Sequence, residues 1–171
     1  MKHILKFTAK LTLLFSLWAF AQAANAQEFR ELGLLFRFGI FTPSSSEASA
    51  VSDNWVVAGA EFRVMNLPGP SNPRKPYLGV SVDVYNKESF GSVPILANYT
   101  AFSGDFHLTA GAGISFVRRP GFESAARAAY QVGAGYTFPG GTPVLFEIRW
   151  FGVEGVSSDL DGFAFTLGVR I

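Results

Sequence analysis

Hydrophobic and polar residues alternate along several stretches of this chain. The clearest stretch is 162–171, where every second residue is apolar: Phe163, Phe165, Leu167, Val169 and Ile171. A period of two residues is typical of a β-strand whose two faces meet different surroundings. Residues 31–40 and 78–85 repeat the pattern, with small or polar residues on the second face. The sequence therefore predicts an all-β protein.

Turn-forming residues divide the chain into eight predicted strands. Clusters of Gly, Pro, Ser, Asn and Asp separate the alternating stretches, as in connections between strands. The predicted strands are 29–41, 54–65, 77–85, 93–102, 106–117, 125–138, 144–152 and 162–171. The connection Thr42–Asp53 is rich in Ser and Ala, and we expect it to be a mobile contact loop.

Residues 1–26 have the parts of a secretory signal peptide. Three lysines precede the apolar run Leu11–Ala21, and small residues follow at Ala24-Asn25-Ala26. The run is shorter than the ~20 apolar residues that span a bilayer as a helix. We expect cleavage after Ala26, with cleavage after Ala23 as the alternative. Residues 27–171 then form a single exported domain.

Composition and charge exclude several classes of function. The chain has 171 residues, of which 16% are charged, and it has no cysteine. A disulfide scaffold, a thiolate zinc site and a cysteine nucleophile are therefore excluded. Without residues 1–26 the chain keeps eleven basic and thirteen acidic residues, which gives no electrostatic reason to expect nucleic-acid binding. The GxG stretches 111–113 and 133–135 lie inside predicted strands, so we expect no nucleotide, cofactor or metal site there.

The composition of the small or polar face indicates which face points outward. A soluble barrel carries Lys, Glu and Gln outside, whereas glycine is the commonest residue on this face and lysine is scarce. Small side chains suit the interior of a narrow barrel. Aromatic residues near predicted strand ends match the interfacial girdles of a membrane barrel: Trp55, Tyr77, Phe102, Phe106, Phe138 and Trp150. We predict an eight-stranded antiparallel transmembrane β-barrel with its apolar face toward lipid.

The charged residues of the predicted inner face have nearly balanced signs. Arginine forms forked pairs with carboxylates, and charges beneath lipid are tolerated when they pair with one another. We predict an ion-pair network that fills the lumen and leaves no open pore. Its members are Glu31, Arg37, Glu61, Arg63, Asp83, Arg127, Glu147, Arg149 and Arg170.

Four segments carry a resemblance to a known family: Leu108–Phe116 (LTAGAGISF), Val132–Phe138 (VGAGYTF), Phe146–Phe151 (FEIRWF) and Gly162–Ile171 (GFAFTLGVRI). The chain resembles the eight-stranded outer-membrane barrels of the OmpA, OmpX and OmpW type, the porin-like outer-membrane β-barrel domain. This implies a bacterial outer membrane reached through the periplasm, with lipid and lipopolysaccharide around the barrel. It also implies the barrel-assembly machinery as partner during insertion. Members usually end in an aromatic residue, whereas this chain ends in Ile171.

The resemblance also implies an orientation and a role. Both termini would lie in the periplasm, and the loops at 42–53, 86–92, 118–124 and 153–161 would lie outside the cell. The leading expectation is a structural or surface-interaction protein, not an enzyme. The alternatives are a channel for small solutes or hydrophobic compounds, and a soluble secreted barrel with an apolar ligand cavity.

A lipid A-modifying enzyme is the remaining alternative, and it depends on one histidine. Barrel lipid A deacylases use a His and Ser pair, to which His107 and Thr109 bear a faint similarity. Catalysis would require a hydroxyl within hydrogen-bond reach of the imidazole, oriented by a carboxylate and open to substrate. The parity of the strand points His107 inward, so we expect a hydrogen bond in the lumen instead.

Overall fold

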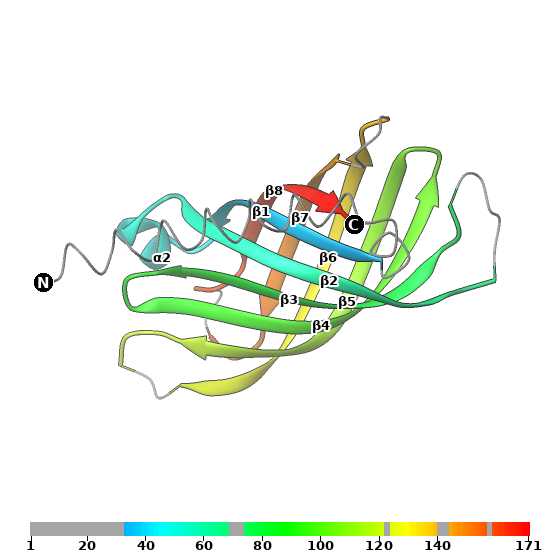
Figure 1. Ribbon diagram of the computed structural model, residues 1–171. Coiled ribbons are helices and arrows are strands. Elements are labelled where there is room, and N and C mark those ends of the chain that lie inside the picture. Colours follow the sequence, from blue (N-terminus) through cyan, green and yellow to red (C-terminus); the bar gives the residue numbers. More distant parts are fainter. Residues whose placement is uncertain (1–32, 69–73, 122–123, 140–143, 157–158) are drawn as a thin grey trace, which may run out of the picture.

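Eight antiparallel strands close into a barrel in the described part of the chain (Figure 1). The computed structural model describes residues 33–68, 74–121, 124–139, 144–156 and 159–171. The strands are β1 (Leu34–Pro43), β2 (Trp55–Asn66), β3 (Tyr77–Lys87), β4 (Phe90–Ser103), β5 (Phe106–Arg118), β6 (Ala125–Thr137), β7 (Val144–Val153) and β8 (Gly162–Arg170). Each strand pairs with the next, and β8 pairs with β1. The predicted fold class is confirmed, while the signal peptide and Glu31 lie outside the described residues.

The barrel has two ends, which we name by their connections. The loop end carries the connections β1–β2, β3–β4, β5–β6 and β7–β8, and the turn end carries the other three. The hairpin of β3 and β4 is tighter than predicted, because Lys87 pairs with Phe90 and only two residues intervene. Ser92, expected in a loop, instead points inward and shares a 2.6 Å hydrogen bond with Ser115 of β5. Asn86 and Ser92 thus lie in strands because their cross-strand partners outweigh the low strand propensity of Asn and Ser.

The first connection at the loop end contains a helix, α2 (Ser46–Val51), where the sequence predicts a loop. The side chain of Ser45 accepts a hydrogen bond from the backbone N–H of Ala48 at 3.1 Å and caps the helix. Ala48 itself is fully buried. The cap fixes the start of the helix, and Ala48 attaches the helix to the barrel because it belongs to the same buried apolar cluster as Phe41 and Trp55. No helix in the described ranges is long and apolar enough to span a bilayer.

The apolar face of the strands points outward. Phe38 and Ile40 are each 49% exposed, whereas Arg37, which directly precedes Phe38, is 3% exposed. Exposed large hydrophobic residues occur on all eight described strands. Strands of 9 to 14 residues also match the length that a tilted strand needs to cross the hydrocarbon layer. The predicted inside-out arrangement is confirmed.

Three of the six aromatic residues predicted for the interfacial girdles point into the barrel: Trp55, Tyr77 and Phe102. Trp55 and Tyr77 are 1% and 2% exposed, whereas Phe106 and Phe138 lie on the outer surface. Phe102 is half-buried with its ring centroid 5.8 Å from that of the inward His107, whereas Trp150 is half-buried on the outside, with its ring centroid 4.7 Å from that of Phe163. The prediction was wrong for Trp55, Tyr77 and Phe102 because strand parity, rather than nearness to a strand end, decides which way a side chain points.

Candidate functional site: the filled lumen

The centre of the lumen holds one arginine between two carboxylates. Arg37 on β1 donates from Nη2 to Glu61 Oε2 at 2.6 Å and from Nε to Glu147 Oε2 at 2.5 Å. These residues come from β1, β2 and β7, and each is at most 3% exposed. A buried carboxylate requires such a partner, because the low dielectric of the interior makes an unpaired charge costly.

A second ion pair spans the lumen between β3 and β7. Arg149 donates from Nη1 to Asp83 Oδ2 at 3.0 Å and from Nη2 to Asp83 Oδ1 at 2.9 Å. This is the forked geometry for which a guanidinium is suited. Arg149 Nε also lies 3.9 Å from Glu147 Oε2, which brings the two ion-pair groups into contact.

Neutral polar side chains join these groups into one network. Tyr77 donates to Glu61 Oε1 at 2.5 Å, and Asn98 Nδ2 donates to Glu61 Oε2 at 3.1 Å. Gln131 Nε2 donates to Asn98 Oδ1 at 2.6 Å, and Gln131 Oε1 accepts from Arg149 Nη1 at 3.2 Å. Tyr77, Asn98 and Gln131 were not among the predicted members, because only charged residues of the inner face were taken as candidates. Their inward parity was the available signal.

Glycines make room for these large polar side chains. Gly59 pairs with Asp83, Gly111 with Asn98, and Gly133 with Arg149 across neighbouring strands. A Cβ atom at Gly59 would lie 2.1 Å from Asp83 Oδ1, and one at Gly111 would lie 1.9 Å from Asn98 Oδ1. The glycines of the inner face thus stand opposite the residues that fill the lumen.

His107 is bonded to the ionic network rather than to a hydroxyl. Its Nε2 lies 2.9 Å from Glu147 Oε1, and the residue is 3% exposed. The hydroxyl of Thr109 pairs instead with that of Thr100 on β4, at 2.9 Å. The structure therefore gives His107 the carboxylate partner of a catalytic dyad, but it directs the nearby threonine hydroxyl elsewhere.

Three predicted members of the network lie apart from its centre. Arg127 is exposed, and its guanidinium lies near Gly155 at the loop end, so its predicted burial was wrong. Its parity points inward, but β6 begins only two residues earlier, where the barrel opens to water. Arg63 and Arg170 are half-buried at the turn end.

An apolar plug closes the lumen at the loop end, where the sequence predicted a polar interior. We define it by the buried side chains of Phe41, Trp55, Tyr85, Phe151 and Leu160. The rings of Phe41 and Tyr85 stack with centroids 4.1 Å apart, and the Tyr85 hydroxyl donates to the Leu160 carbonyl at 3.0 Å. The lumen is thus polar at its centre and apolar toward the loops.

Comparisons with known proteins show the fold and no family. No family model matches the chain, and no curated protein matches it. A solved structure from the de novo design of transmembrane β-barrels is similar, with a TM-score of 0.51 and 13% sequence identity. The match covers 81% of this chain and 95% of the designed chain. This chain therefore has the fold of a closed, eight-stranded antiparallel transmembrane β-barrel.

Proposed function

We propose that this chain is an integral outer-membrane β-barrel with a plugged lumen, which serves as a structural element or as an interaction surface through the loop end. The observation that carries the proposal is that bulky side chains fill the lumen along its length. Arg149 and Tyr77 lie fully buried at the centre and turn side, and Trp55, Phe41 and Tyr85 lie fully buried toward the loops. Narrow barrels of eight strands are filled in this way.

The outer surface supports insertion into lipid. A contiguous band of exposed Phe, Ile, Leu and Val would be an aggregation hazard in water but is the normal lipid contact of a membrane barrel. We accordingly propose outer-membrane lipid and lipopolysaccharide as surroundings and the barrel-assembly machinery as partner during insertion. The designed transmembrane neighbour supports a membrane location, and the sequence resemblance to outer-membrane barrels is the reason to propose the outer membrane.

Membrane fractionation tests the location. We expect the protein to stay in the membrane pellet after carbonate and high-salt washes and to need detergent for release. The detergent extract should migrate differently before and after boiling, because a closed barrel resists unfolding in detergent. Release by carbonate alone would refute membrane insertion and favour the soluble secreted barrel.

Planar-bilayer recording tests the plug. We expect no stepwise conductance from the wild-type protein, because the ionic network and the apolar plug occupy successive levels of the lumen. Stable channels in the wild type would refute the plugged barrel and favour the channel alternative.

Lipid A analysis tests the enzyme alternative. Expression of the wild type and of His107→Ala should give the same lipid A profile. A difference between the two profiles would favour the enzyme.

A further inference from the structure

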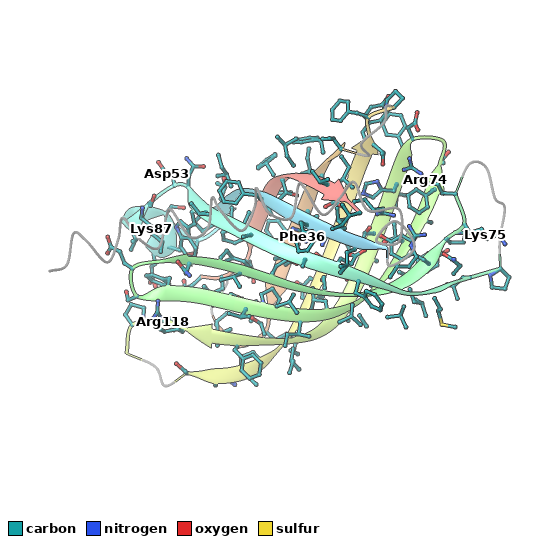
Figure 2. All side chains as sticks on the ribbon, in the orientation of Figure 1. Phe36, Asp53, Arg74, Lys75, Lys87 and Arg118 are labelled. Atoms are coloured by element: carbon teal, nitrogen blue, oxygen red, sulfur yellow. The ribbon has the colours of Figure 1, made fainter. Side chains whose placement is uncertain are left out.

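Three arginines gather at the turn end of the lumen around two aromatic rings. Arg63 lies over the ring of Tyr77, with Cζ 4.6 Å from the centroid, and Arg170 lies 5.3 Å from the same centroid. Arg74 and Arg170 lie 5.7 Å and 5.9 Å from the ring of Phe102. We call these three residues the turn-end arginine cluster. Figure 2 shows Arg74 at the opposite end of the barrel from Arg118 and Lys87.

The turn-end arginine cluster has no carboxylate partner within the described ranges. Arg37 and Arg149 each have an acid within 3.0 Å, whereas the ion pairs of the described residues include none from Arg63, Arg74 or Arg170. The nearest acid of the network is already engaged, since Glu61 accepts from Arg37, Tyr77 and Asn98. Among the described residues, the charge of the cluster therefore has no carboxylate that pairs with it.

Several N–H donors of the cluster form no hydrogen bond with the described residues. Arg170 uses Nη2 on the Tyr77 hydroxyl at 3.1 Å, and Arg74 uses Nη1 on the Thr137 hydroxyl at 2.8 Å. Arg63 Nε and Arg170 Nη1 are buried and have no hydrogen-bond partner among the residues that the structure describes. A buried donor without an acceptor is costly, and several in one place indicate a missing acceptor.

The charges around Arg63 also favour a bound anion. Burial disfavours the charge of Arg63 most, and the charges of Arg170 and Arg74 repel it, while Glu61 attracts it from a distance. The aromatic rings of Tyr77 and Phe102 contact the guanidinium faces, which orders the side chains and leaves the N–H edges available. Three guanidinium groups with available edges match an anion that has several acceptor oxygens and more than one negative charge.

We infer that the turn-end arginine cluster binds a phosphate-bearing anion. The anion would accept hydrogen bonds from Arg63 and Arg170 and neutralise the positive charge at this end of the lumen. A phosphate fits better than a single carboxylate, because it offers more acceptor oxygens and carries close to two charges at neutral pH. The same chemistry is present in free phosphate esters and in phospholipid headgroups, which the experiment separates.

Calorimetric titration of the folded protein in a non-ionic detergent with inorganic phosphate tests the free source. We expect saturable binding, weakened at least about tenfold, or about 1.4 kcal/mol, in Arg63→Gln and in Arg170→Gln. Lys75→Gln is the matched control, because Lys75 is exposed at the same end and its loss changes the net charge equally. Arg118→Gln at the loop end is a second control.

Native mass spectrometry of the protein from nanodiscs tests the lipid source. One set of nanodiscs contains phosphatidylcholine alone, and the other adds phosphatidic acid, which has a phosphomonoester headgroup. Retention of phosphatidic acid by the wild type but not by Arg63→Gln would support the site with a headgroup as its ligand. Heat-modifiable gel migration verifies that each variant is folded. Arg63→Lys tests whether a positive charge without the forked donor geometry of a guanidinium is enough for binding.

The possible results either support or overturn the site. Arginine-dependent binding of inorganic phosphate, of phosphatidic acid or of both supports it. If the wild type binds neither, or if Lys75→Gln weakens binding as much as Arg63→Gln does, the inference is overturned. Because these measurements use folded protein in detergent or nanodiscs, failure here would leave the plugged membrane barrel itself standing.

Discussion

Breaking the forked pair of Arg149 and Asp83 should destabilise the barrel strongly, and the loss should be larger when the arginine is removed than when the aspartate is. Both side chains are at most 1% exposed, and Asp83 receives both of its hydrogen bonds from that guanidinium. Arg149→Met therefore leaves a buried carboxylate without its partner, for which we expect a loss of about 3–5 kcal/mol in the free energy of unfolding. Asp83→Asn should cost less, about 1.5–3 kcal/mol, because Arg149 keeps Gln131 at 3.2 Å and Glu147 at 3.9 Å.

The double variant is the critical measurement. Asp83→Asn combined with Arg149→Met removes both charges, so its loss should fall short of the sum of the single losses by about 0.5–3 kcal/mol. Equilibrium urea unfolding in lipid vesicles, followed by tryptophan fluorescence, measures all three variants. The exposed Arg118→Gln serves as control, with an expected change within about 0.5 kcal/mol. Additive losses, or an Arg149→Met loss no larger than that of the control, would refute the reasoning.

Three further variants examine the inner face, the lipid face and the helix. Gly59→Ala should lower folding yield sharply, because its Cβ would meet Asp83 Oδ1 at 2.1 Å, while the outward substitution Ala110→Val should be tolerated; equal yields would contradict this. Phe165→Arg on the outer face should cost about 2–4 kcal/mol in vesicle unfolding if it lies near the bilayer midplane, and no cost would argue against lipid contact. Ser45→Ala should destabilise α2 by about 0.5–2 kcal/mol, seen as faster amide exchange at residues 46–51, with the rates of β5 unchanged.

The faces of the strands were readable from the sequence because a period of two is a local property of the extended chain. The alternation of Phe163, Phe165 and Leu167 with small residues predicts both a strand and the direction of each side chain. Turn residues likewise predict where most strands end. The scarcity of lysine and the abundance of glycine on one face then identify that face as the interior. Fold class and the inside-out arrangement follow from these local signals.

The tertiary structure decided which inward residues meet. Arg149 and Asp83 are 66 positions apart and come together only because the closed sheet places β3 and β7 across the lumen from each other. The sequence also carries no local signal for how far along the barrel axis a residue lies. Arg127 is exposed at the loop end, whereas Arg37 is buried at the centre, although both have inward parity. Closure of the sheet fixes both relations, because curvature and register determine which side chains share the same narrow space.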